Sequence, residues 1–154
     1  MIKYLVLIAV LPFAPVIGQY AGCDYQQNMI LGQTYDIFSP GYGTNQLYPS
    51  GRNCRWRAVA PVNSLIRLNC FDMRLPQNNC VDRIEMSWTG TYNDPNPTYA
   101  CSGQTFTYTT GNQLVVALRS QVTGFAGGMF RCQIVAQQST SGIIGTPIGV
   151  PIGK

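Results

Sequence analysis

The sequence predicts an all-β fold, an antiparallel sandwich of two sheets cross-linked by disulfides. Three observations lead to this prediction. Short segments alternate between apolar and polar residues with a period of two, which is typical of strands with one buried face. Clusters of proline, glycine, asparagine and aspartate separate these segments and predict turns. Six cysteines, an even number, are enough for three disulfides.

The first 18 residues are expected to be a secretory signal peptide, outside the folded domain. Lys3 supplies a positive charge, residues 4–16 form a mostly apolar run, and cleavage is expected after Gly18. The alternative is a membrane anchor. The run is about 13 residues and contains Pro12 and Pro15, so it is too short to span the hydrocarbon core of a bilayer. No later segment is apolar enough to cross a membrane, and we expect a secreted, extracellular protein.

The domain is expected to span residues 19–136, with five clear strand candidates. In chain order they are Arg55–Val59, Ile66–Cys70, Ile84–Trp88, Leu114–Leu118 and Phe130–Ile134. Four of them alternate, whereas Leu114–Leu118 is apolar on both faces, as expected of a central strand. The aromatic residues between the third and fourth candidates are interpreted as a loop region that packs against the core or binds protein. They are Tyr92, Tyr99, Phe106 and Tyr108.

Residues 137–154 differ from the rest of the chain. They lack strand alternation and contain a near-repeat of Pro-Ile-Gly. Because glycine and proline disfavour a regular core element, this segment is expected to be a flexible tail or linker. Its isoleucines and valine leave open an alternative, in which it docks on the domain or on a partner.

Composition argues against several classes of function. The formal net charge of +4 is a mild basic excess, too small for a nucleic-acid-binding surface. The chain has no histidine, so no Ser-His-Asp or Cys-His arrangement can form. No glycine-rich phosphate loop is present. With only six acidic residues, a pair of catalytic carboxylates is improbable, and we expect no enzymatic activity.

The cysteines are expected to form disulfides and not a zinc site. Zinc would require close cysteine pairs or histidines, and the tightest cysteine spacing here is ten residues. Six cysteines permit 15 connectivities. Side-chain direction narrows the choice of pairs. Cys70 lies at the end of one inward strand face and Cys132 lies on another, so the two can meet if their strands are close. The most economical set is Cys23–Cys54, Cys80–Cys101 and Cys70–Cys132.

Several short motifs follow one another in an order that resembles the CUB domain, an extracellular β-sandwich of the jelly-roll type. They are Ser39-Pro40-Gly41-Tyr42, Tyr48-Pro49, Asn53-Cys54-Arg55-Trp56, Ile66-Arg67-Leu68, Cys80-Val81-Asp82-Arg83-Ile84-Glu85, Cys101-Ser102-Gly103 and Asn112-Gln113-Leu114-Val115-Val116. They cover about Cys23 to Ala136. The resemblance implies the disulfides Cys23–Cys54 and Cys80–Cys101, in agreement with the economical set.

The third pair, Cys70 and Cys132, is similar to CUB domains that precede the catalytic domain of some insect secreted serine proteases. The sequence itself contains no Gly-Asp-Ser-Gly segment. Two hypotheses therefore stand: a secreted, non-catalytic CUB-type binding module, or the N-terminal regulatory region of a secreted serine protease whose catalytic domain is absent from this chain. A structural component without a specific ligand is a third class.

The resemblance also raises the question of calcium. Many CUB domains bind calcium through three acids, and Asp82 matches one of them. The first falls at Arg74–Pro76, where no glutamate is present, and the third falls at Gln121. Asp82 is therefore only a weak metal candidate, although Asp72 could substitute as a ligand. We expect no cofactor, no calcium dependence, and a structural role for the Asp82 carboxylate.

Outward-facing arginines are the remaining candidates for binding. Arg55, Arg57, Arg67 and Arg83 are expected to point away from the core. If their strands align, they form a basic surface for an extracellular protein or a sulfated glycan. The alternative is a set of solvated strand faces with no ligand.

Overall fold

The computed structural model describes residues 23–120 and 127–139. The expected signal peptide and residues 140–154 of the expected tail lie outside the described residues. The expected start of the tail was wrong, because Gln137 and Gln138 belong to the last strand. In chain order the elements are β1 (Asp24–Asn28), β2 (Thr34–Phe38), the 3-10 helix η1 (Tyr42–Thr44), β3 (Cys54–Val59), β4 (Ser64–Arg74), β5 (Arg83–Ser87), β6 (Thr98–Ala100), β7 (Phe106–Thr110), β8 (Gln113–Arg119) and β9 (Met129–Gln138). Within this part of the chain, no helix has the length and apolar character needed to span a membrane.

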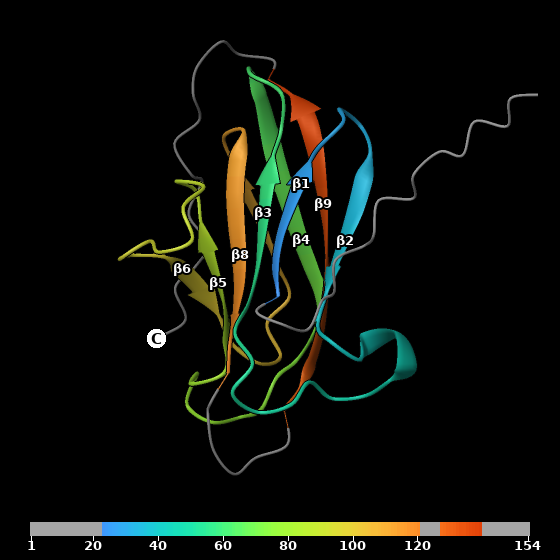
Figure 1. The fold of residues 1–154 in the computed structure, drawn as a ribbon, viewed down its shortest axis with the longest axis vertical. Coiled ribbons are helices and arrows are strands. Elements are labelled where there is room, and N and C mark those ends of the chain that lie inside the picture. Colours follow the sequence, from blue (N-terminus) through green and yellow to red (C-terminus); the bar gives the residue numbers. More distant parts are fainter. Residues whose placement is uncertain (1–22, 121–126, 140–154) are drawn as a thin grey trace, which may run out of the picture.

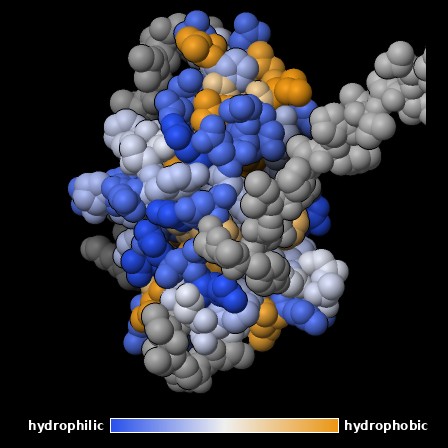
Figure 2. Space-filling view, in the orientation of Figure 1, coloured by the Kyte–Doolittle hydropathy of each residue, from blue (hydrophilic) through white to orange (hydrophobic). Residues whose placement is uncertain are grey.

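The strands form two sheets packed face to face, as predicted (Figure 1). The five-stranded sheet has the order β1-β3-β8-β5-β6, and the four-stranded sheet has the order β2-β9-β4-β7. All pairs of named strands are antiparallel except β1 and β3, which run parallel. In Figure 1 the five-stranded sheet lies in front. Figure 2 shows that this side of the molecule is mainly hydrophilic.

The five expected strands correspond to β3, β4, β5, β8 and β9, and four further strands were not predicted. Two details of the prediction were wrong. Strand β5 ends at Ser87, and Trp88 beyond it is 55% exposed. Phe106 and Tyr108 belong to β7 and face the core, so they are not part of a loop. The threonines beside them gave β7 a polar appearance and hid its alternation.

Strand β8 lies in the middle of its sheet and is buried on both faces, as its composition predicts. Its inward side chains join the core, whereas Val115 and Ala117 face outward and are nevertheless buried. The loop between β5 and β6 folds over them. The hydroxyl of Tyr92 in this loop donates to the carbonyl oxygen of Tyr25 on β1, 3.2 Å away. The loop therefore crosses the outer face from β5 to the far edge strand.

The core fills the space between the two sheets. Its largest fully buried side chains are Tyr48, Ile66, Leu68, Ile84, Met86, Leu114, Leu118 and Phe130. Trp56 packs edge-on against Phe130, with ring centroids 5.6 Å apart. Burial of a side chain of this kind contributes about 1.5–3 kcal/mol. The alternating faces recognised in the sequence therefore supply the main driving force for folding.

The three disulfides join Cys23 to Cys54, Cys70 to Cys132 and Cys80 to Cys101, the set that the sequence favoured. Cys70 and Cys132 lie directly opposite each other on the neighbouring strands β4 and β9. This bond therefore lies within the four-stranded sheet and does not bridge the two sheets. The part of the chain that the structure describes has no free cysteine.

Candidate protein-binding surface

A β-bulge in β4 exposes a large aromatic side chain on the outward face of the four-stranded sheet. Cys70 lies opposite Cys132, and the next pair is Asp72 opposite Arg131, so Phe71 is an extra residue in β4. A bulge of this kind redirects side chains. Phe71 and Asp72 both face outward, while Cys70 and Met73 on either side of them are buried. As a result, Phe71 is 42% exposed.

Arg131 on β9 lies beside Phe71 and is held from several directions. Its guanidinium carbon is 5.6 Å from the centroid of the Phe71 ring, within range of a cation–π interaction. Its Nε donates to Oδ1 of Asp36 on β2, 3.1 Å away. Gln133 donates to the same oxygen over 3.3 Å. Contacts from β4 and β2 therefore position the Arg131 side chain.

The disulfide between β4 and β9 positions the same two residues. Phe71 directly follows Cys70, and Arg131 directly precedes Cys132. The covalent bond fixes the two strands next to the bulge, so the backbone beneath the aromatic ring and the guanidinium has little freedom to shift. The disulfide that stabilises the core thus also holds the exposed pair.

Tyr42 and Phe38 extend this surface toward the β2 end of the sheet. The Tyr42 hydroxyl donates to Oδ2 of Asp72 over 2.9 Å. Arg74 donates to both oxygens of the same carboxylate, at 2.8 Å from Nε and 2.7 Å from the terminal nitrogen. The rings of Phe38 and Tyr42 are 6.3 Å apart and tilted. Asp72 therefore links a tyrosine from η1 to an arginine from β4.

We call this region the Phe71 surface and define it as Phe38, Tyr42, Phe71, Arg74 and Arg131. Aromatic residues and arginine are the types enriched at the centres of protein–protein interfaces. The ion pairs to Asp36 and Asp72 hold both arginines in place before any partner arrives. Such preorganisation lowers the entropy lost on binding. The arrangement is therefore suited to contact with another protein.

The pKa of Asp72 reports on this network. Hydrogen bonds from Arg74, with a smaller one from Tyr42, hold the pKa of the Asp72 carboxyl below its ordinary value. Because the pKa is lower in the folded state, the carboxylate stabilises the fold above its unfolded-state pKa, and this contribution is lost as pH falls through the folded-state pKa. We expect Arg74→Gln to raise the pKa of Asp72, measured by NMR titration of the carboxyl carbon. Arg67→Gln is the matched control, and an unchanged pKa in Arg74→Gln would contradict the assignment.

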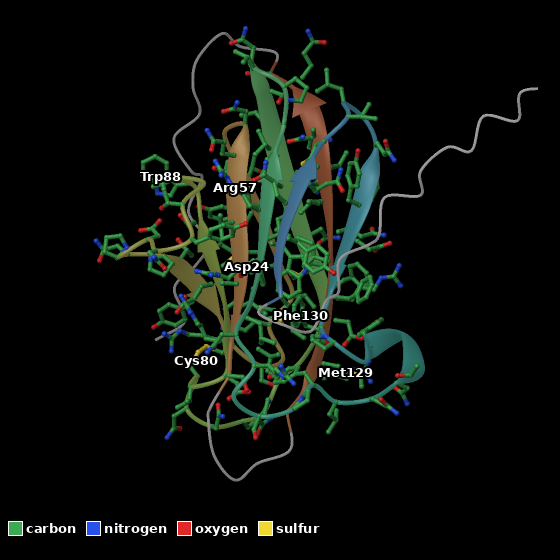
Figure 3. All side chains as sticks on the ribbon, in the orientation of Figure 1. Asp24, Arg57, Cys80, Trp88, Met129 and Phe130 are labelled. Carbon is green, nitrogen blue, oxygen red and sulfur yellow. A yellow bond between two sulfur atoms is a disulfide. The ribbon has the colours of Figure 1, made fainter. Side chains whose placement is uncertain are left out.

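The four arginines expected to bind a ligand do not share one surface. Arg55, Arg57 and Arg83 lie on the five-stranded sheet, whereas Arg67 is on β4 in the other sheet. The prediction of one continuous basic surface is therefore wrong, because it required the strands to align within one sheet. Figure 3 shows Arg57 on the front of the molecule, together with Asp24.

The arginines of the five-stranded sheet have intramolecular partners. Arg55 donates from Nε to Oδ1 of Asp24 over 2.7 Å, and its guanidinium lies 4.6 Å from the centroid of the Tyr92 ring. Arg83 and Arg119 both pair with Glu85, at 2.7 Å and 2.8 Å. Asp24 and Glu85 therefore offset part of the positive charge on this face.

Arg57 and Arg67 differ from this pattern. Arg57 donates to Oε1 of Gln113 over 3.2 Å. Its Nε is buried and has no hydrogen-bond partner in residues 23–120 and 127–139. Arg67 is exposed on the outward face of the four-stranded sheet. These two residues lie on opposite sides of the sandwich, so they cannot both bind one small ligand.

The Asp82 carboxylate is buried and engaged by neutral donors. Asp82 is 2% exposed. The hydroxyl of Tyr48 donates to Oδ2 over 2.7 Å, and the side-chain amide of Asn78 donates to Oδ1 over 2.9 Å. Burial and the contact with Asp82 raise the pKa of the Tyr48 hydroxyl, so it remains a donor. Asp72, the possible substitute ligand, is held by Arg74 on the outward sheet face.

We predict that calcium does not stabilise this domain. The described residues contain no cluster of three or more acidic, cysteine or histidine side chains that could hold a metal ion. The third expected position, Gln121, lies outside the described residues. The melting temperature should be the same in millimolar calcium as in EDTA, because a ligand that binds only the folded state would raise it. A calcium-dependent rise of several degrees would show that the prediction is wrong.

Comparison with known proteins identifies structural neighbours. No protein-family model and no curated protein sequence matches the chain. Among solved structures, the CUB1-EGF-CUB2 domains of rat MASP-1 match with a TM-score of 0.59 and 17% identity, over 73% of this chain and 42% of that chain. The corresponding human MASP-1/3 domains match with a TM-score of 0.53 and 16% identity, over 73% and 40%. The fold is CUB-like.

A further neighbour is the full extracellular region of zebrafish Gpr126/Adgrg6. It matches with a TM-score of 0.60 and 20% identity, over 77% of this chain and 15% of that chain. The chain thus spans less than half the length of each of these three neighbours. At such low identities the likeness establishes the fold and leaves the function of this chain to be argued from its own residues.

Sequence reasoning missed Phe71 as an exposed residue. The signal was present in the spacing of apolar residues. Leu68 and Cys70 follow a period of two, whereas the next inward residue, Met73, comes three positions after Cys70. This break in period indicates a bulge, and a bulge places two consecutive side chains on one face.

Proposed function

We propose that this domain is a secreted, non-catalytic, CUB-type binding module that recognises an extracellular protein through the Phe71 surface. The observation that carries the proposal is the exposed Phe71 ring at the β4 bulge, next to an arginine that Asp36 holds in position. Aromatic residues and arginine are the residue types that usually form an interface hot spot. A partner can remove water from both the Phe71 ring and the preorganised arginine.

A protein fits these residues better than a sulfated glycan does. Sulfate groups are recognised by cations that are available to bind them. Here Asp24, Glu85, Asp72 and Asp36 already pair with arginines. A glycan would have to compete with these carboxylates, whereas an apolar partner side chain can pack on Phe71 without breaking an ion pair.

An extracellular location is part of the proposal. Three disulfides are typical of proteins that fold in an oxidising compartment. The CUB-like fold and the likeness to an extracellular region support the same location. The expected signal peptide supplies the route of export.

The second candidate is a regulatory region of a secreted serine protease. The observation that favours it is the additional disulfide Cys70–Cys132, the pair by which the sequence is similar to CUB domains that precede a serine protease domain. Sequencing the transcript beyond the codon for Lys154 tests it. A continuing frame that encodes a histidine-containing catalytic domain would support this candidate, and an immediate stop codon would remove it.

Affinity capture from the native extracellular fluid tests the proposal directly. The mature protein is immobilised alongside Phe71→Ala and Thr107→Ala. Thr107 is exposed on β7, at the opposite edge of the same sheet, and serves as the matched control. Each capture is run with and without EDTA, and bound proteins are quantified by mass spectrometry.

We expect one saturable protein partner that the unmodified chain and Thr107→Ala retain and Phe71→Ala loses, independently of EDTA. Equal capture by all three chains would place the binding site elsewhere. If added heparin abolishes capture equally for all three chains, a glycan-binding function would be favoured. No saturable partner would leave the domain as a structural component.

A further inference from the structure

The sandwich is open along the side where β1 and β2 lie. Strand β1 is the edge of the five-stranded sheet, and β2 is the edge of the four-stranded sheet. The two strands lie on the same side of the molecule (Figure 1), but they belong to different sheets. An edge strand presents backbone N–H and C=O groups that can pair with another chain. Among the described residues, this side of the sandwich therefore presents two edge strands.

A cleft of about 230 Å³ lies between these edges. Strands β1, β2, β3 and β9 contribute to its walls. The aromatic residues that line it and pack against the core are Tyr25, Tyr35 and Trp56. Ile37, Ala58 and Ile134 add aliphatic surface, and Gln27 lies at the exposed margin. The buried hydroxyl of Tyr25 has no hydrogen-bond partner among the described residues. Gln26, Asp36 and Arg57 also line the cleft, so its walls combine apolar surface with polar groups.

The size of the cleft indicates what can enter it. An enclosed cavity of about 150 Å³ is enough to hold a benzene ring, whereas pockets for complete drug-sized ligands are about 300–1,000 Å³. The space here is suited to one or two apolar side chains. It is too small for a nucleotide or a comparable cofactor.

The pairing of β2 shows which backbone groups face the open side. The N–H of Ser39 donates to the carbonyl oxygen of Phe130 on β9. In an antiparallel pair such residues alternate, so Ile37 and Tyr35 also face β9. The backbone groups of Asp36 and Phe38 therefore point toward the free edge. An added strand could pair with them.

We propose that the β2 edge binds an extended peptide segment of a partner protein as an additional strand, with alternate apolar side chains inserted in the cleft. Side chains of the added strand that lie beside Tyr35 and Ile37 point into the cleft, because these two residues face inward. Backbone pairing supplies part of the affinity, and the cleft selects apolar side chains at every second position.

The negative charge of Asp36 indicates which residue type the added strand should carry between its two apolar positions. Asp36 is on the outward face of β2 and its side chain is 38% exposed. The Asp36 carboxylate already pairs with Arg131, and a lysine directly opposite it on the added strand would share that carboxylate. The ligand class is therefore an extended peptide with the pattern apolar, basic, apolar. This site lies beside the Phe71 surface but requires neither Phe71 nor Arg74.

The test uses the blocked peptide Ac-Thr-Phe-Lys-Val-Thr-NH2 as the probe. Trp88→Phe is introduced first, so that the tryptophan emission of the described domain comes from Trp56. Trp88 is exposed and does not line the cleft. We expect a saturable change in Trp56 emission as the peptide is added. Replacing the Phe and Val of the peptide by Ala should weaken binding by about tenfold or more, since burial of such side chains is lost.

Two further comparisons separate strand addition from simple insertion of a side chain. Methylation of alternate backbone nitrogens, those that would face β2, should weaken binding by about tenfold or more, because the hydrogen bonds to the edge strand are lost. Gln27→Phe, which fills the margin of the cleft, should abolish the response. Thr107→Phe on the opposite edge strand is the matched control and should bind normally.

Three results would overturn the proposal. They are no saturable response up to the solubility limit of the peptide, equal binding of the methylated peptide, or a normal response in Gln27→Phe. Sedimentation of the chain alone gives a fourth outcome. A dimer that Gln27→Phe dissociates would show that a second copy occupies the cleft. Because Phe71→Ala should leave the peptide response intact, failure here and failure of the proposed function are distinguishable.

Discussion

Replacing both Cys70 and Cys132 by alanine is expected to lower the free energy of unfolding by about 4 kcal/mol. This disulfide closes the longest loop of the three, with 62 positions between its cysteines. A cross-link of that span removes more conformational entropy from the unfolded chain than a short one does. In chemical denaturation, the midpoint denaturant concentration and the free energy of unfolding extrapolated to water should both be lower.

The double variant Cys80→Ala with Cys101→Ala is the matched comparison, because its loop spans only 21 positions. We expect a smaller loss, about 3 kcal/mol in the same treatment of loop closure. The Cys70 and Cys132 variant should also weaken partner binding, because Phe71 and Arg131 adjoin these cysteines. Equal stability losses and unaffected binding would show that the β4–β9 disulfide has no special role.

Replacing Gly127 by alanine is expected to destabilise the domain by about 3 kcal/mol, at the upper end of the usual cost of overpacking. A methyl group there would lie 1.7 Å from the carbonyl oxygen of Tyr48, which is backbone and cannot move aside. The clash falls next to the hydrogen bond from the Tyr48 N–H to the carbonyl of Gly128. Thermal unfolding should show a lower melting temperature, together with loss of near-ultraviolet signal from Tyr48.

Gly111→Ala is the control for this effect. A methyl group added at Gly111 would have no atom within 4 Å, and the backbone of Gly111 is not in the left-handed region. We expect a change of about 0.5 kcal/mol or less, or a slight gain, because alanine restricts the unfolded chain. Similar losses for both variants would mean that the close approach to Tyr48 is not the cause.

Much of the fold could be predicted from the sequence because its strands bury one face. Strands such as β4 and β9 alternate over many residues, so their inward cysteines and the disulfide between them followed from side-chain direction. The edge strands were harder to recognise. Strand β1 carries mainly polar, exposed residues, and β6 has three residues, so neither has an apolar period. Parallel pairing of β1 with β3 is set by tertiary structure and has no local signature.

The candidate site was less predictable than the fold. Arg55, Arg57 and Arg83 were correctly expected to face outward, but alternation cannot tell which sheet a strand joins, and Arg67 proved to be on the other sheet. Nor can a count of charges show that Glu85 lies between Arg83 and Arg119. Whether an arginine is available to a ligand depends on such contacts, which bring together residues far apart in the sequence.

The affinity of the captured partner for Phe71→Ala tests the central claim most directly. The partner is titrated by calorimetry against the mature domain, Phe71→Ala and the Thr107→Ala control. If Phe71 is the hot spot of the interface, its truncation should weaken binding by about 30-fold or more, which corresponds to about 2 kcal/mol. Thr107→Ala should bind as the unmodified domain does. A dissociation constant for Phe71→Ala within about threefold of the unmodified value would contradict the account, because a loss below about 1 kcal/mol is typical of peripheral contacts.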